Sequence, residues 1–216
     1  MMFQNRIDAA KKLAKDLEWV KNSDPILLAI PRGGVIIADI ISSTLNIGLD
    51  IIVSKKIGAP HNSEFAIGAV MPDGSYVLNE EVTKMLVISQ HYIDAEVAST
   101  VKEIERRLMK FRGSKEYGLE GKTVVLVDDG IATGATMFVA IQWVKKQKPK
   151  QIIVAIPVGP KETIDQINNV VDKVVVLQAP VYFNAVGEFY REFDQVDDYK
   201  VQEIMSKHGY KIKLME

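Results

Sequence analysis

The sequence predicts an α/β fold in which a mainly parallel sheet carries helices on both faces. Short apolar runs recur along the chain, and between them lie segments with apolar residues at the three- and four-residue spacing that is typical of helices. Strands that alternate with helices form parallel sheets, because a helix is the usual crossover between parallel strands. The strands are almost continuously apolar, as expected where both faces of a sheet are covered.

The first half of the chain is expected to provide two core strands and a hairpin. Apolar residues before Asn22-Ser23-Asp24-Pro25 recur at helical spacing, and this polar segment ends the helix. Pro72-Asp73-Gly74 is a turn signal between two apolar segments, which favours a hairpin. The expected elements are a helix over 4–20, a strand over 26–30, a helix over 35–45, a strand over 50–54, and hairpin strands over 65–70 and 76–78.

The second half begins with a long helix over 79–111 and then alternates strand and helix. Asn79 can cap the long helix, and two acids, Glu80 and Glu81, suit its first turn. The pattern also allows a break near 89–92. The remaining expected elements are a strand over 123–127, a helix over 134–147, a strand over 151–157, a helix over 160–170, a strand over 173–177 and a helix over 197–207 that Gly209 ends.

No internal repeat, low-complexity linker or clear boundary divides the chain. We therefore expect a single domain over residues 1–216, with a helical insertion at about 79–112 and a C-terminal hood segment at about 180–216. The 47% hydrophobic and 25% charged residues are ordinary for a globular protein. A chain of 216 residues can bury roughly 70% of its unfolded surface, which is enough for one continuous core.

Charge and residue usage argue against several classes of function. Lys and Arg number 27 against 28 Asp and Glu, so the chain lacks the basic excess of a typical nucleic-acid-binding protein. The absence of cysteine excludes disulfides, thiolate metal sites and a cysteine nucleophile. No apolar run approaches the roughly 20 residues of a membrane span, and the charged N-terminal segment does not read as a signal peptide. We expect a soluble cytoplasmic protein with no membrane or nucleic-acid partner.

The segment over 124–136, VVLVDDGIATGAT, carries the chemistry. An apolar strand delivers Asp128 and Asp129 to its carboxyl end, where open parallel sheets bind ligands. The loop that follows opens a helix, so its backbone N–H groups and threonine hydroxyls can bind a phosphate. Carboxylates suit sugar hydroxyls or a magnesium ion. A phosphorylated ribose fits this arrangement. The loop residues are Gly130, Ile131, Ala132, Thr133, Gly134, Ala135 and Thr136.

Other phosphate sites built on similar loops fit the sequence less well. A P-loop would need lysine where Ala135 stands, and no G-x-G-x-x-G follows the first strand. A phospho-accepting receiver also has paired acids at strand ends, but after its first strand and with a further Asp on a later one. Here the pair follows a late strand.

The same segment resembles the 5-phosphoribosyl-1-pyrophosphate (PRPP) binding motif of type I phosphoribosyltransferases. The resemblance implies their fold and a magnesium-dependent activity: transfer of the 5-phosphoribosyl group of PRPP to a nitrogenous base or other amine, with release of pyrophosphate. It implies that Asp128 and Asp129 contact the ribose hydroxyls and, directly or through water, Mg²⁺. The loop from Ala132 to Thr136 would bind the 5-phosphate. PRPP and a small-molecule acceptor are the implied partners, and a homodimer is allowed.

Pro31-Arg32-Gly33-Gly34 stands where such enzymes place a pyrophosphate-binding loop. In relatives this loop contains a non-proline cis peptide, which the resemblance implies between Arg32 and Gly33. Backbone N–H groups of Gly33 and Gly34, with Arg32 as a catalytic residue, would then face the pyrophosphate. Lys55 and Lys56, expected at the end of the second strand, could add positive charge there or could be ordinary strand-end lysines.

Two further regions resemble a subgroup known only as predicted phosphoribosyltransferases. They are residues 55–69 and 179–190. The subgroup does not reveal the acceptor. Ala132 stands where hypoxanthine–guanine enzymes carry an Asp that serves the purine N7, which argues against that substrate class, although adenine enzymes also have Ala there.

By this resemblance, catalysis is expected to be electrostatic. Positive charge builds on the ribose as pyrophosphate leaves, and the two aspartates favour that charge. Residues 56–64 are the candidate for a mobile loop over the site. The helix over 79–111 is either a cover for the sheet or a hood that contributes to base recognition or to a dimer interface. The alternative function is a non-catalytic PRPP-sensing regulator on the same fold.

Overall fold

A five-stranded parallel sheet forms the centre of the protein. The structure is a computed structural model, and it describes residues 2–212. The strand order is β2-β1-β6-β7-β8, and every neighbouring pair is parallel. The strands are β1 (Pro25–Ala29), β2 (Gly48–Ile51), β6 (Thr123–Val127), β7 (Gln151–Val158) and β8 (Lys173–Gln178). This confirms the predicted mainly parallel sheet.

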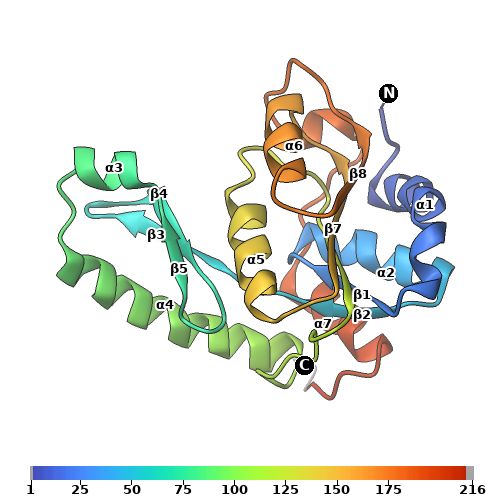
Figure 1. Cartoon of the computed structure of the whole chain (residues 1–216), viewed down its shortest axis with the longest axis horizontal. Coiled ribbons are helices and arrows are strands. Elements are labelled where there is room, and N and C mark those ends of the chain that lie inside the picture. Colours follow the sequence, from blue (N-terminus) through green and yellow to red (C-terminus); the bar gives the residue numbers. More distant parts are fainter. Residues whose placement is uncertain (1, 213–216) are drawn as a thin grey trace.

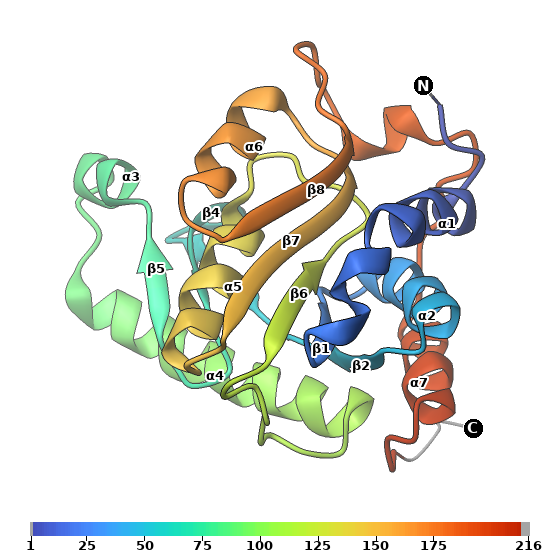
Figure 2. The ribbon, with the colours of Figure 1, turned by 45° about the vertical axis from the view of Figure 1, so that its right-hand side comes forward.

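Helices cover both faces of this sheet (Figure 2). One face carries α1 (Arg6–Asp16) and α2 (Gly33–Leu45), and the other carries α5 (Ala135–Lys146) and α6 (Lys161–Asn168). Successive strand residues point to opposite faces: in β1, Leu27 joins the apolar cluster under α1 and α2, and Leu28 joins the cluster under α5. Both are fully buried, which explains why the strands read as continuous apolar runs.

A second, antiparallel sheet and two helices stand to one side of the parallel sheet (Figure 1). We call this segment, residues 55–111, the hood. Its strands are β3 (Lys55–Ala59), β4 (Asn62–Val70) and β5 (Tyr76–Leu78), and its helices are α3 (Glu80–Met85) and α4 (Gln90–Phe111). The predicted hairpin at Pro72-Asp73-Gly74 is present between β4 and β5.

The start of the hood differs from the prediction. The second parallel strand ends at Ile51, and Lys55 and Lys56 begin β3 instead of ending that strand. The candidate mobile loop over 56–64 is therefore largely a β-hairpin, in which β3 pairs with β4. The hydroxyl of Tyr92 in α4 also donates a hydrogen bond to the carbonyl oxygen of Gly58, at 3.0 Å.

The long predicted helix is divided into α3 and α4, at the break that the sequence allowed. Ser89 caps α4 by accepting a hydrogen bond from the N–H of Tyr92, at 3.2 Å. Val87 has a positive φ of 50°, so the chain changes direction between the two helices. Near the N-terminus, the helix predicted over 4–20 consists of α1 followed by the 3₁₀ helix η1 (Glu18–Asn22).

The C-terminal segment lies mainly against the first two helices. Residues 186–189 form a 3₁₀ helix, η2 (Val186–Phe189), and Tyr190 pairs with Phe3 in a parallel bridge. Helix α7 (Asp198–Lys207) contacts both α2 and the hood helix α4. The last residues of the predicted C-terminal hood segment, 213–216, lie outside the described residues. Within 2–212, no helix combines the length and apolar character that a membrane crossing requires.

Candidate functional site

Asp128 and Asp129 follow β6, the middle strand of the parallel sheet, at the edge where the carboxyl ends of the strands meet. Asp129 forms an ion pair with Arg6: Arg6 Nε lies 2.7 Å from Asp129 Oδ2. The two side chains are only 12% and 14% exposed. The contact joins the first turn of α1 to the candidate site, because Asn5 caps α1 and makes Arg6 its first residue.

Arg6 is a site residue that the sequence analysis did not identify. Its Nη1 donates a hydrogen bond to the carbonyl oxygen of Asp194, at 2.8 Å. Its guanidinium carbon lies 3.9 Å from the centroid of the Phe193 ring. No local signal marks this residue, because Arg6 and Asp129 are 123 positions apart and Arg6 stands in an ordinary amphipathic helix.

The two aspartates differ in their environment. Withdrawal of the Asp128 carboxyl from water raises its pKa well above the usual value, and the charge of Asp129 raises it further. The N–H of Asp129 donates a hydrogen bond to Asp128 Oδ1, at 2.8 Å, and opposes this shift. Unlike Asp128, Asp129 has the guanidinium of Arg6 as a direct ion-pair partner.

The loop after the aspartates is hydrogen-bonded to β7 and α6, and several of its residues are exposed. The N–H of Ile131 bonds to the carbonyl of Val158 at 2.9 Å, and the hydroxyl of Thr163 bonds to the carbonyl of Ala132 at 3.2 Å. Gly134 stands directly before α5 and has a φ of 75°, a left-handed backbone conformation that favours glycine. Ala132, Thr133 and Ala135 are exposed. The arrangement leaves the start of α5 accessible to an anion.

Pro31-Arg32-Gly33-Gly34 lies directly against the aspartates. A Cβ added to Gly33 would stand 1.8 Å from Asp129 Oδ2, and one added to Gly34 would stand 2.7 Å from the carbonyl oxygen of Val127. The two glycines begin α2. The two segments that the sequence analysis singled out are therefore in contact, although about 95 residues separate them along the chain.

One detail of this loop corrects the prediction. The cis peptide bond is between Pro31 and Arg32, one bond earlier than the predicted Arg32–Gly33 bond. Gly33 is already part of α2, so its backbone follows the helix. The Arg32 side chain extends toward α7, where its Nη1 lies 3.6 Å from Asp198 Oδ1.

Comparison with known proteins identifies the family. The family model described as the phosphoribosyl transferase domain matches residues 2–191. The chain belongs to the phosphoribosyltransferase family. Two Mycobacterium tuberculosis proteins, from strains CDC 1551 and H37Rv and each named "Putative phosphoribosyl transferase", are 36% identical to it over 201 residues. The match covers 93% of this chain and 45% of theirs, so the chain spans about half the length of these relatives.

A solved structure is similar along its whole length. The crystal structure of TT1426 from Thermus thermophilus is 36% identical in sequence and superposes with a TM-score of 0.81. The match covers 96% of this chain and 99% of that one. The similarity to TT1426 therefore extends over the hood and the C-terminal segment as well as the parallel sheet.

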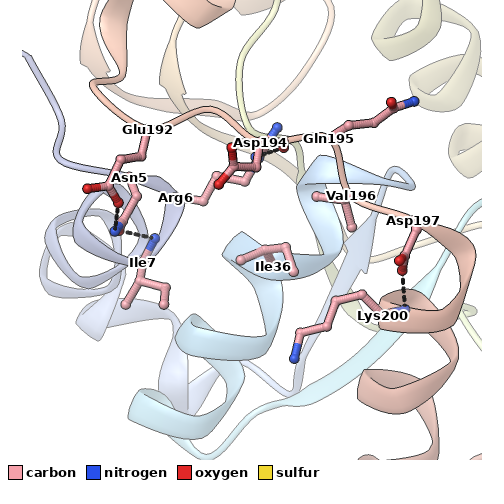
Figure 3. A pocket seen from close by; sticks show the side chains of 10 residues that line it. All are labelled: Asn5, Arg6, Ile7, Ile36, Glu192, Asp194, Gln195, Val196, Asp197 and Lys200. Atoms are coloured by element: carbon pink, nitrogen blue, oxygen red, sulfur yellow. Dashed lines mark hydrogen bonds between the residues drawn. The ribbon is translucent and has the colours of Figure 1, made fainter.

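Two cavities border the candidate site. One, of about 280 Å³, lies beside Arg6 between α1, α2 and the start of α7 (Figure 3). The other, of about 350 Å³, lies between the hood and the parallel sheet. Pro31 and Thr136 contribute to the second cavity, and so do Lys55 and Lys56. This cavity thus brings both predicted lysines next to the two loops.

The aspartates fit a magnesium ion that is shared with a substrate. Arg6 engages one oxygen of Asp129, the N–H of Asp129 engages one oxygen of Asp128, and the two carboxyl side chains also interact with each other. Within the described residues, no group of three or more His, Cys, Asp or Glu side chains could hold a metal by itself. Mg²⁺ commonly binds one or two carboxylates together with substrate phosphates, so this donor set is compatible with it.

Proposed function

We propose that the protein is a magnesium-dependent phosphoribosyltransferase that transfers the 5-phosphoribosyl group of PRPP to a nitrogenous base or other amine. The observation that carries the proposal is the contact between the Asp128-Asp129 pair and Gly33 and Gly34, beside an open loop at the start of α5. Such a site has carboxylates that can bind ribose hydroxyls. On either side of the carboxylates lie backbone N–H groups that can bind anions. PRPP has its ribose hydroxyls between a phosphate and a pyrophosphate, so its groups follow the same order as the groups of the site.

The proposed site assigns one part of PRPP to each segment. Asp128 and Asp129 bind the ribose hydroxyls, and the loop over 132–136 binds the 5-phosphate. Arg32, Gly33 and Gly34 bind the pyrophosphate, together with Lys55 and Lys56. A magnesium ion, when bound at the aspartates, would offset the charge of the leaving pyrophosphate.

The reaction exchanges one bond at the anomeric carbon of the ribose. The bond to the pyrophosphate oxygen breaks and its electron pair leaves with pyrophosphate, while the acceptor nitrogen forms the new bond and releases its proton to solvent. Positive charge develops on the ribose in the transition state, and the carboxylates of Asp128 and Asp129 stabilise it. The contact between the two loops would also hold the reacting groups in position, which lowers the barrier further.

The acceptor and the biological setting remain predictions from the family. Ala132 has no carboxylate to offer a purine N7, which favours acceptors other than hypoxanthine and guanine. A cytoplasmic location, a single domain over 1–216 and a homodimer likewise remain predictions.

A pyrophosphate-release assay tests the activity. The protein is incubated with PRPP and MgCl₂ and a panel of purines, pyrimidines and small amines. We expect release that depends on one acceptor class. Stabilisation by PRPP in a thermal melt, with no release for any acceptor, would instead support a PRPP-sensing regulator.

The double variant Asp128→Asn/Asp129→Asn tests the role of the carboxylates. The amides keep the shape of the site but remove both charges, so we expect turnover to fall at least about a thousandfold, as when a principal electrostatic contact is lost. Replacement of the exposed Asp165 by Asn, on α6, serves as the control and should leave turnover unchanged. Undiminished turnover in the double variant would refute the assignment.

A further inference from the structure

The cavity between the hood and the parallel sheet is unusually rich in positive charge. Three cationic side chains line it: Lys55 and Lys56 from β3, and Arg107 from the hood helix α4. No carboxylate is among the described residues that line it. Pro31 and Thr136, from the two loops of the proposed site, border the same space.

The charges of this cavity are only weakly neutralised by the protein. Within residues 2–212, Lys55 and Lys56 have no ion-pair partner. Arg107 makes one hydrogen bond, from its Nε to Glu103 Oε1 at 3.2 Å. Its side chain is 40% exposed, which allows a ligand to reach it.

The partner of Arg107 is held more closely by another residue. Arg106 donates two hydrogen bonds to Glu103, from Nε and Nη2, each 2.8 Å long. Hydrogen bonding from Arg106 is also the chief reason why the pKa of Glu103 is lowered to about 2. Glu103 is therefore paired mainly with Arg106, and the terminal nitrogens of Arg107 have no acceptor among the described residues.

A cavity lined by three cations and no carboxylate attracts a polyanion, because the field of like charges in a concave surface is focused inward. Arginine suits phosphate groups in particular, since its planar guanidinium donates two parallel hydrogen bonds to phosphate oxygens. The pyrophosphate of PRPP is the most highly charged group in the proposed ligand. It is also the group assigned to the Pro31–Gly34 loop, which borders this cavity.

We propose that Arg107 of the hood binds the pyrophosphate end of PRPP, together with Lys55 and Lys56. The inference rests on the proposed function and adds a substrate-binding residue to it. The hood is then more than a cover for the sheet: it supplies the side of the site that faces the leaving group. Arg107 is a binding residue in this assignment and takes no part in proton transfer.

Calorimetric titration of the full chain in MgCl₂ tests the inference with three ligands: inorganic pyrophosphate, PRPP and ribose 5-phosphate. For Arg107→Gln we expect binding of pyrophosphate and of PRPP to weaken about tenfold or more, as for loss of a hydrogen bond to a charged group. Binding of ribose 5-phosphate should change less than twofold, because it lacks the pyrophosphate. Arg107→Lys keeps the charge without the planar fork and should give an intermediate loss.

Lys102→Gln is the matched control, because Lys102 is an exposed cation on the same helix, α4, and does not line the cavity. It should bind all three ligands as the unmodified protein does. Equal effects of Lys102→Gln and Arg107→Gln, while the unmodified protein binds PRPP, would overturn the inference and leave the proposed function standing. If the unmodified protein bound no PRPP, the proposed function would fail and the inference with it. Thermal melts of both variants verify that they are folded.

Discussion

At the scale of single residues, the site depends on the absence of a side chain at Gly33. Its backbone follows the helix, so alanine would be tolerated by the chain itself. The obstacle is Asp129, whose Oδ2 would lie 1.8 Å from the new Cβ. No carbon and oxygen atom can remain at that distance, so either Asp129 or the start of α2 must move. Glycine is needed at position 33 because the Asp129 carboxylate lies directly against its backbone.

We therefore predict that Gly33→Ala lowers the affinity for PRPP at least about tenfold and lowers the free energy of unfolding by about 1–3 kcal/mol, as for other overpacked sites. Urea unfolding and calorimetric titration measure the two effects. Gly48→Ala is the control, because nothing lies within 4 Å of its added Cβ. A Gly33→Ala protein that matched Gly48→Ala in both measurements would show that the contact with Asp129 is unimportant.

Residue-scale prediction from the sequence succeeded where the signal was local. Asp128 and Asp129 stand in a continuous pattern with the strand before them and the loop after them, so their place at the end of β6 followed from the sequence. Arg6 carries no such pattern. It reaches Asp129 only through the packing of α1 on the sheet, and periodicity does not describe that packing.

At the scale of elements, a buried ion pair fastens the end of α4 to the parallel sheet. Arg112 follows α4, and its Nε and Nη2 lie 2.6 and 2.8 Å from the two carboxylate oxygens of Asp50 in β2. The side chains are 7% and 4% exposed. Tyr117 stacks on the guanidinium, with 4.2 Å between the ring centroid and the guanidinium carbon. Because Arg107 is five positions earlier, this pair also fixes where Arg107 meets the cavity.

Arg112→Met should lower the free energy of unfolding by about 3–5 kcal/mol, because it leaves the charge of Asp50 buried without its ion-pair partner. The double variant Asp50→Asn/Arg112→Met removes that charge and should recover at least about 1 kcal/mol of the loss, since contacting residues are energetically coupled. Urea unfolding at pH 7 measures both. A loss below about 1 kcal/mol for Arg112→Met would mean that α4 is held by its apolar contacts alone.

Element prediction was most accurate for buried strands and least accurate at the start of the hood. The strand over 123–127 matches β6, since five buried apolar or β-branched residues leave no other interpretation. Strand β3 was missed because its sequence, KKIGA, lacks alternation, and its pairing with β4 shifts register at Ile57 and Gly58. An irregular strand of this kind is specified by its partner more than by its own residues.

At the scale of the whole molecule, the C-terminal helix α7 connects the core to the hood. On one side, Asp39 of α2 binds the C-terminal end of α7: its Oδ1 lies 2.9 Å from Lys207 Nζ and 2.8 Å from His208 Nε2. On the other side, Asp198 of α7 binds Lys110 of α4 at 2.8 Å. The sequence predicted α7 but not these neighbours, because an amphipathic pattern shows which face of a helix is buried and not what covers it.

The strand order β2-β1-β6-β7-β8 was likewise only partly predictable from the sequence. The alternation of strands and helices predicted a parallel sheet, and this restricted the possible topologies. It did not place β6 between β1 and β7. That placement brings the Asp128-Asp129 segment beside the Pro31–Gly34 loop, since β1 and β6 are neighbours in register from Pro25 and Thr123 onward.

The contact between α2 and α7 should make stability depend on pH. Burial opposes ionisation of Asp39, but hydrogen bonds from Lys207 and His208 outweigh burial and lower the pKa of Asp39 below its ordinary value of 3.8. A carboxyl group whose pKa is lower in the folded state stabilises the fold above its ordinary pKa, and this contribution is lost as pH falls toward the lower value. We expect Asp39→Asn to lower the free energy of unfolding by about 1–2 kcal/mol at pH 7.

The difference between the unmodified protein and Asp39→Asn should shrink below pH 4, where Asp39 begins to take up a proton. Urea unfolding at pH 7, 5, 4 and 3 measures it. Asp165→Asn is the control, because its pair with Lys161 is 61% exposed on both sides and should contribute less than about 0.5 kcal/mol at any pH. A difference that grew as pH fell below 4 would contradict the assignment, because it would require Asp39 to bind its proton more tightly in the folded chain.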